Sequence, residues 1–401
     1  MRIWKSLDCW CFTLVIGGYA LGVGARFDLV AGAISLLFAA IAIALYWFFP
    51  AWRRGLIVIA LAALALAPML LAMYLRHSTA PHAFAHDGLV QVEAAIQFLL
   101  IGKNPYREDY FATPLAQWWV PMPGEPVNPA LYHLIYLPGM ILVPAPFYLA
   151  MQLILGWFDL RIVFLGVYGA WLALIPRLTR GAEKKRALIL LAGLNPLLLP
   201  FLIEGRNDVV VLFWITLCIG LLQAERRIGS ALALALACAS KLTAWFILPF
   251  YAIYLIRASP RIFDRRVWMP LAIFVVAFSA IVLPFALWDA RALIDDVFLY
   301  ASGATEFAYP IKSLGWGGIA LAFGWIPNER ANAPFTLLQI IFGAPTLVWL
   351  GWLQLRRNSI RAVWLNYAAL TLVIAFFSRV FNDNHLGYIT SLFILGMFTE
   401  T

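Results

Sequence analysis

Residues 55–75 read GLIVIALAALALAPMLLAMYL and contain no charged side chain. An apolar helix of this length spans about 30 Å, the thickness of the hydrocarbon core of a bilayer. The sequence predicts an all-α, polytopic integral membrane protein of about 11–13 transmembrane segments in a single domain, residues 1–401. Similar apolar runs recur along the chain, at 9–25, 29–49, 131–157, 159–176, 187–203, 208–224, 229–256, 267–288, 313–326, 334–355, 362–378 and 386–399.

The composition excludes a water-soluble globule. Of the 401 residues, 64% are hydrophobic and only 12% are charged, and the mean hydropathy is +0.86. The net charge of +9 would suggest a nucleic-acid partner in a soluble protein. Here the basic residues flank apolar runs, where they orient a chain in the membrane, so no nucleic-acid partner is predicted.

The N-terminus and the cysteines add two expectations. The first apolar run leads directly into a second one, which favours a retained helix over a cleavable signal peptide. The cysteines lie in or beside apolar runs and predict neither a disulfide framework nor a zinc site; they are Cys9, Cys11, Cys218 and Cys238.

The basic residues also predict the topology. Six places hold 18 of the 29 Lys and Arg residues and three acidic residues, a net charge of +15, and the rest of the chain carries −6. We expect these places to be cytoplasmic in a multi-pass protein of the plasma (inner) membrane, with the functional site on the outer side. They are Arg2/Lys5, Arg53/Arg54, 177–186, Arg226/Arg227, 257–266 and Arg356/Arg357/Arg361.

If the basic clusters are cytoplasmic, the chain must cross the membrane an odd or an even number of times between given points. Three apolar stretches do not fit the required number as simple crossings, namely 131–176, 229–256 and 313–326. Prolines interrupt the first, Ser240-Lys241 the second and glycines the third. Irregular backbone at membrane depth is tolerated where it is buried in protein or lines a cavity. We therefore expect broken or re-entrant helices around a cavity that opens to the outer side.

The longest non-spanning stretch, about 76–130, is predicted to be a structured outer loop with amphipathic helices. Asp87 stands at the expected start of a helix, and Glu93 follows within two turns. The simplest interpretation makes Asp87 an N-cap and Glu93 a solvated residue. The alternative is a site, because charged groups also stand at 204–208, Lys241, Lys312 and 379–385, and such groups beside membrane segments usually face a cavity or a partner.

The order of these motifs resembles a known family. Val92-Glu-Ala-Ala95 and Gly102-Lys-Asn-Pro-Tyr-Arg107 resemble the first luminal loop of the catalytic subunit of glycosylphosphatidylinositol mannosyltransferase I, within the GT-C superfamily of polyprenyl-phosphate-sugar-dependent glycosyltransferases. Asn195-Pro196 with 204–208, the stretch 241–251 and Phe381–Tyr388 are similar to its later motifs in the same order. The resemblance covers roughly 90–400 and departs from the family at Glu93, where a second aspartate is usual.

The resemblance implies a GT-C-like bundle that transfers a hexose, with mannose favoured, from a polyprenyl-phosphate donor to a lipid or glycan acceptor, with inversion. Asp87 would be the general base, and cationic groups would stabilise the phosphate leaving group. The residues expected to bind the donor or the acceptor are His86, Glu93, Asn104, Tyr106, Arg107, Arg206, Asn207, Asp208, Lys241, Lys312, Arg379, Asp383 and His385.

No metal or other cofactor is predicted. His82 and His86 have a spacing compatible with a metal on one helix face, but the Pro-containing region before Asp87 does not favour a helix. Two other functions fit parts of the sequence. A secondary transporter or lipid-carrier flippase would also contain broken helices and buried charges, but it would commonly show internal repeats, and we find none. A receptor or scaffold would not concentrate charge around one cavity.

Overall fold

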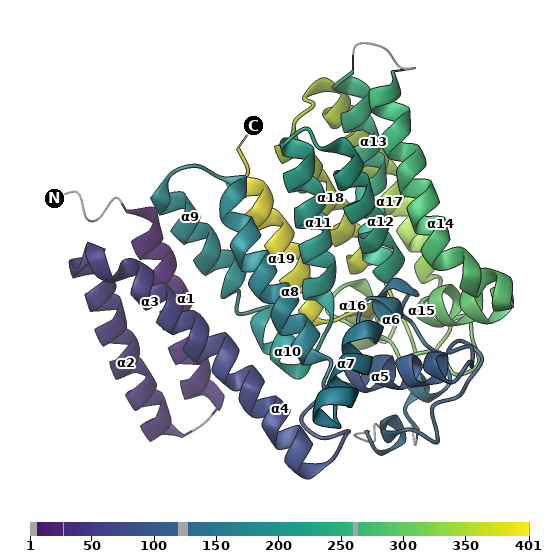
Figure 1. Cartoon of the computed structure of the whole chain (residues 1–401), viewed down its shortest axis with the longest axis horizontal. Helices are drawn as coiled ribbons and strands as arrows, with labels where there is room; N and C mark the ends of the chain where they lie inside the picture. Colours follow the sequence, from purple (N-terminus) through teal and green to yellow (C-terminus); the bar gives the residue numbers. More distant parts are fainter. Residues whose placement is uncertain (1–5, 27, 119–126, 260–263, 401) are drawn as a thin grey trace.

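The computed structural model describes residues 6–26, 28–118, 127–259 and 264–400, and this part of the chain is mostly helical with almost no sheet (Figure 1). Its one sheet is a short parallel pair, in which β1 (Lys312–Ser313) lies beside β2 (Val380–Phe381). The all-α prediction is therefore confirmed for the described residues. The four cysteines are free and buried.

Five helices are long and apolar enough to cross a membrane, judged by length and composition. They are Val30–Phe48, Pro50–Thr79, Arg161–Leu178, Arg265–Ser302 and Phe335–Arg356. Six shorter apolar helices of 10–17 residues accompany them in the described part of the chain. The side chains of the five long helices are largely exposed, as expected for helices whose apolar surface faces lipid.

The N-terminal helices form the left side of the molecule in Figure 1. The α3 helix runs through a π-helical turn into α4, so that the run 55–75 forms one continuous helix. Asp8, which is fully buried, pairs with Arg53 at 3.5 Å and with Arg186, and these ion pairs join α1 to α3 and α9. The bounds are α1 (Leu7–Arg26), α2 (Leu29–Phe48), α3 (Arg53–Leu61) and α4 (Ala67–Thr79).

The expected outer loop contains α5, which lies with two short helices at the lower end of Figure 1. The apolar stretch 131–157 is divided into α6 and α7 beside Pro138 and Pro144, as the prolines predicted, because proline cannot donate the helix hydrogen bond. In this region only α8 together with the 3-10 turn that follows it, Arg161–Leu178, is long enough to cross a membrane. The bounds are α5 (Asp87–Leu100), α6 (Gly139–Leu142), α7 (Ala145–Leu155) and α8 (Arg161–Leu174).

The next helices contain two breaks. The predicted break at Lys241 is present, because α12 ends at Ser240 and α13 begins at Leu248. The expectation of an unbroken helix over 187–203 is wrong, since the chain turns at Asn195-Pro196, where Asn195 accepts a hydrogen bond from the amide of Leu197. The bounds are α9 (Ala182–Leu188), α10 (Leu199–Glu204), α11 (Asp208–Gln223), α12 (Arg227–Ser240) and α13 (Leu248–Arg257).

The C-terminal third begins with the long helix α14, whose backbone is kinked at Asp289. The short stretch 313–326 forms only α16, which has seven residues and is too short to cross a membrane. The bounds are α14 (Arg265–Ile294), α15 (Tyr300–Ser302), α16 (Trp316–Ala322), α17 (Phe335–Arg356), α18 (Ile360–Phe376) and α19 (Asp383–Phe398).

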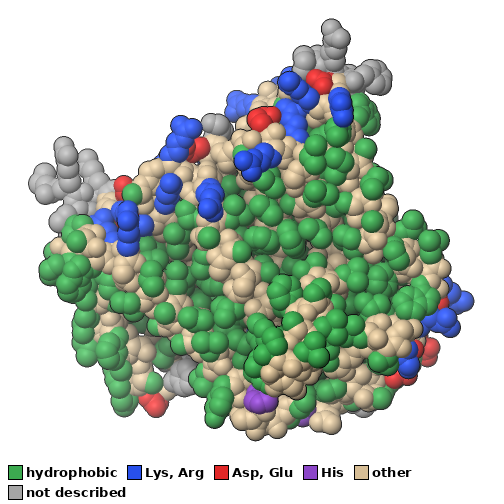
Figure 2. All heavy atoms as spheres, in the orientation of Figure 1, with side chains coloured by type: hydrophobic (Ala, Val, Ile, Leu, Met, Phe, Trp, Pro, Cys, Tyr) green, Lys and Arg blue, Asp and Glu red, His purple; other side chains and the backbone are tan. Residues whose placement is uncertain are grey.

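Lys and Arg side chains gather along the upper edge in Figure 2, opposite the end at which α5 lies. This edge contains the start of α9 and the connection from α11 to α12, where the sequence places basic clusters. The Arg2/Lys5 cluster lies outside the described residues. We call this side the basic edge and the opposite side the α5 end.

Candidate functional site

Asp87 is the first residue of α5, and it is buried. The N-cap is His86, so the interpretation of Asp87 as an N-cap is wrong by one residue. Oδ1 of Asp87 lies 2.8 Å from Nδ1 of His86 and accepts a hydrogen bond from the Gly88 amide at 2.7 Å. Oδ2 has no hydrogen-bond partner among the described residues, so one carboxylate oxygen is held in place and the other is available.

The charges around Asp87 keep it ionised. Burial alone would raise its pKa, but His86, the Gly88 amide and Arg206 outweigh burial, so the pKa of Asp87 is lowered from its ordinary value. A carboxylate that is negative across the neutral pH range is available as a base, although a low pKa limits its intrinsic basicity.

A second buried carboxylate, Asp208, begins α11. Its Oδ1 lies 2.5 Å from Nζ of Lys241, and its Oδ2 accepts a hydrogen bond from Asn384 at 2.8 Å. Asn384 in turn accepts a hydrogen bond from Arg206 at 2.7 Å, and Lys241 also donates to Asn207 at 3.2 Å. Residues from three separate motifs of the sequence, 204–208, Lys241 and 381–388, thus form one hydrogen-bonded network.

Tyr136 joins this network to Asp87. A Cβ atom added at Gly88 would lie 2.1 Å from the Tyr136 hydroxyl, so the ring lies directly against the first turn of α5. Burial and the charges of Asp87 and Asp208 raise the pKa of Tyr136, whereas Arg206 and Asn207 lower it, so its hydroxyl lies near residues on both sides of the cluster. We call the whole group the Asp87–Asp208 cluster; it comprises Asp87, Tyr136, Arg206, Asn207, Asp208, Lys241, Asn384 and His385.

The turn before α11 packs closely on the start of α5. Gly205 has a φ of +96°, a conformation that L side chains rarely adopt, and a Cβ there would lie 2.2 Å from Leu89. The amide of His86 donates to the carbonyl of Glu204 at 2.8 Å. The glycine therefore allows the 204–208 turn to bring Arg206 and Asp208 to the start of α5.

His385 lies in the first turn of α19. Its Nδ1 accepts a hydrogen bond from the amide of Asn382 at 3.0 Å, and it experiences the charges of Asp208, Lys241 and Arg206. Asn195 fixes this helix by donating to Ser391 at 3.0 Å and to the Gly387 carbonyl at 3.2 Å. The motif residue Asn195 thus positions α19.

Glu93 belongs to a different network. Arg76 holds its two oxygens at 2.9 and 2.6 Å, and Arg76 also contacts Asp159 at 3.1 Å. Asp159 is further paired with Arg161, at 2.6 Å. All four side chains are buried, so the interpretation of Glu93 as a solvated residue is wrong, and the structure assigns it to an ion-pair network that joins α5 to α4 and α8.

A cavity of about 270 Å³ lies beside this network. Arg76, Glu93 and Asp159 form part of its wall, together with Gln97 and Trp157. The face of α5 that carries Glu93 forms one wall of the cavity. None of the residues that line the cavity belongs to the Asp87–Asp208 cluster.

The other predicted site residues of the first loop contact protein groups. Asn104 accepts a hydrogen bond from the Tyr106 amide at 3.1 Å, and the Tyr106 hydroxyl donates to the Tyr136 carbonyl at 2.7 Å. Arg107 is mostly exposed and lies 3.4 Å from Asp289. These contacts shape the loop and place the Tyr136 backbone.

Three predicted residues, Arg379, Lys312 and Asp383, lie near the last loop. Arg379 is buried and donates to the carbonyls of Tyr309 and Ala331, at 2.5 and 3.1 Å. Lys312 is exposed in β1, and Asp383 is exposed at the start of α19. Their expected roles in binding stay predictions.

Sequence reasoning missed Tyr136 and Asn384 as site residues, although Asn384 stands between two predicted ones. It also missed the one group of His and Asp side chains in the described chain that are close enough to share a metal ion, His133 with Asp295 and Asp296. Neither His82 nor His86 belongs to that group, and the segment that joins these two residues is a turn.

No protein-family model matches this chain, and a comparison with curated proteins finds no match either.

Proposed function

We propose that this chain is a polytopic membrane glycosyltransferase with a GT-C-like bundle of about 11–13 transmembrane segments. It transfers a hexose, with mannose favoured, from a polyprenyl-phosphate donor to a lipid or glycan acceptor. The observation that carries the proposal is the Asp87–Asp208 cluster. Asp87 is a buried carboxylate with one available oxygen and experiences the charge of Arg206, and Lys241 pairs with the second buried carboxylate, Asp208.

Asp87 is the general base in this proposal. His86 and the Gly88 amide hold Oδ1, so the available Oδ2 removes the proton from the acceptor hydroxyl as that oxygen attacks the anomeric carbon. The bond from the anomeric carbon to the phosphate oxygen breaks in the same displacement, which inverts the configuration. The expulsion of a phosphate monoester is the reason that cations are needed nearby.

Arg206 and Lys241 can supply this stabilisation. Lys241 has three N–H donors and uses two, on Asn207 and Asp208. Arg206 uses Nε on Glu204 and Nη1 on Asn384, which leaves Nη2 without a partner in the described chain. Both side chains are partly exposed, so an anion can reach the remaining donors.

The lipid tail of the donor requires the reaction to occur near the membrane surface. In this proposal the basic edge faces the cytoplasm and the α5 end faces the outer side of the plasma membrane. Three helices begin at the cluster and α12 ends there, which supports placing the cluster at the membrane surface, where a polyprenyl phosphate would present its head group.

The test is a transfer assay on the full chain reconstituted in liposomes with a panel of polyprenyl-phosphate hexoses and extracted membrane lipids as acceptors. We expect Asp87→Asn to abolish transfer and to retain donor binding. The matched control is Asp109→Asn, which makes the same change at an exposed carboxylate of the same loop. Unchanged transfer by Asp87→Asn would exclude its role as base, and translocation of the intact donor without transfer would favour a flippase.

A further inference from the structure

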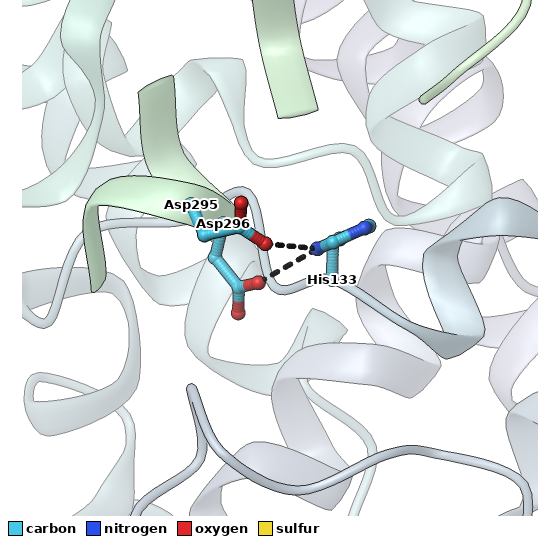
Figure 3. A group of neighbouring side chains, drawn as sticks. All are labelled: His133, Asp295 and Asp296. Carbon is cyan, nitrogen blue, oxygen red and sulfur yellow. Dashed lines mark hydrogen bonds and ion pairs between the residues drawn. The ribbon is translucent and has the colours of Figure 1, made fainter. Parts of the chain in front are cut away.

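His133 lies opposite two consecutive carboxylates at the α5 end (Figure 3). Its Nδ1 is 2.9 Å from Oδ1 of Asp296 and 3.3 Å from Oδ2 of Asp295. The two aspartates begin the π-helical turn Asp295–Leu299 after α14, and His133 lies in the segment before α6. Three side chains from two distant parts of the chain therefore converge on one point.

The backbone holds these ligands in place before any ion binds. The amide of Leu134 donates to Oδ2 of Asp296 at 2.8 Å. Gln91 on α5 donates to the His133 carbonyl at 2.7 Å and to the Ala130 carbonyl at 2.6 Å. His133 and Asp296 are buried, whereas Asp295 is partly exposed and offers a route to solvent.

The group brings two adjacent carboxylates together, and no Lys or Arg side chain pairs with them in the described chain. Nε2 of His133 is buried without a hydrogen-bond partner in the same part of the chain. A divalent ion bound between Nδ1 and the two carboxylates would balance the charge of both aspartates.

We propose that His133, Asp295 and Asp296 bind a divalent metal ion. Metal–ligand bonds of about 2.1 Å place neighbouring ligand atoms about 3.0–3.4 Å apart. The 3.3 Å distance from Nδ1 to Asp295 lies in this range, and the 2.9 Å distance to Asp296 lies just below it. All three ligand atoms lie within 4.8 Å of one another, so a small rotation of the partly exposed Asp295 completes the set. One imidazole nitrogen with two carboxylates suits Mn²⁺ or Zn²⁺ better than Ca²⁺.

The site borders the Asp87–Asp208 cluster through Tyr300. The Tyr300 ring stacks on His133 with 4.8 Å between the ring centroids. Its hydroxyl is buried without a partner in the described chain and experiences the charges of Asp87, Tyr136 and Asp296. Three protein ligands leave coordination positions open to water or to an oxygen of a ligand, as in zinc sites that take part in catalysis.

The test is isothermal titration of MnCl₂ and of ZnCl₂ into the EDTA-treated full chain in detergent, without any substrate. We expect one equivalent of either ion to bind saturably and to raise the melting temperature. His133→Ala and Asp296→Asn should weaken binding at least tenfold. Asp295→Asn should weaken metal binding as well. Because Asp295 is partly exposed, this variant should fold and so tests the proposal even if the buried His133 and Asp296 variants do not fold.

The matched control is Asp289→Asn, which converts a carboxylate to an amide on the same helix, at the residue that pairs with Arg107. Binding by this variant should equal that of the wild type. Absence of saturable binding of both ions, or equal affinity in the folded His133 and Asp296 variants, would refute the proposal. The titration does not measure sugar transfer, so its failure is distinguishable from failure of the proposed glycosyltransferase activity.

Discussion

The hydroxyl group of Tyr136 lies against Gly88, where a Cβ atom would approach it to 2.1 Å. This contact brings a side chain from the segment before α6 onto the first turn of α5, directly beside Asp87. The two buried carboxylates of the Asp87–Asp208 cluster are therefore joined through a tyrosine that can only occupy this position if residue 88 has no side chain.

Gly88→Ala should displace the Tyr136 ring and lower transfer at least tenfold. We also expect a loss of about 1–3 kcal/mol in the free energy of unfolding, because added volume in a packed interior forces its neighbours to move. Thermal unfolding and transfer rates measure the two effects. Gly166→Ala is the control, since nothing lies within 4 Å of a Cβ at that position, and equal behaviour of the two variants would contradict the packing argument.

His86→Gln should move the acid limb of the pH–rate profile upward. In the wild type the pKa of Asp87 is lowered, so the base stays ionised until the pH falls through that lowered value. Without His86, burial raises the pKa of Asp87, and protonation occurs at higher pH. The measurement is kcat/KM for transfer as a function of pH, and an unchanged acid limb would show that His86 does not control Asp87.

Lys241→Met should lower transfer by at least a hundredfold and destabilise the protein by about 3–5 kcal/mol, because it leaves Asp208 as an unpaired buried charge. The double variant Lys241→Met/Asp208→Asn separates the two effects. We expect it to recover most of the melting temperature but not the donor binding. Recovery of transfer together with stability would indicate that Lys241 is only structural.

Glu93→Gln should lower the melting temperature more than it lowers the specific activity of the folded fraction. The change removes one partner of a buried, bidentate ion pair and leaves Arg76 with only Asp159 as a charged partner. Removing one partner of such a pair costs about 3–5 kcal/mol. If the variant instead keeps its stability and loses donor affinity, Glu93 takes part in donor binding, as the sequence predicted.

Cysteine labelling can test the orientation, because the four native cysteines are buried and should react slowly. We expect Asp109→Cys, at an exposed position near the α5 end, to react with a membrane-impermeant maleimide on intact cells. Arg180→Cys, whose side chain is 92% exposed at the basic edge, should react only after the membrane is opened. The reverse pattern would overturn the proposed topology.

The sequence predicts best where one physical property decides the structure. Apolar runs predict α11 and α17 because length and hydropathy alone suffice, and Lys241 predicts a break because a charge in an apolar helix needs a partner. The break at Asn195-Pro196 was missed although proline signals it, because the apolar run continues on both sides.

The contacts of the predicted site residues required the fold. The motifs 204–208, Lys241 and 381–388 were assigned to one site by their charge, and the structure brings Arg206, Asp208, Lys241 and Asn384 together. The partners of Glu93 could not be predicted, since they depend on how α4, α5 and α8 pack. His133 and Asp296 are 163 residues apart, and no local pattern connects them.

Three helices start at the Asp87–Asp208 cluster, since α5 begins at Asp87, α11 at Asp208 and α19 one residue before Asn384. Aligned peptide dipoles give the beginning of each helix about half a positive elementary charge. The backbone therefore contributes a positive field that no substitution of a side chain removes. An anion drawn to this place by Arg206 and Lys241 would retain part of its attraction after either cation is lost.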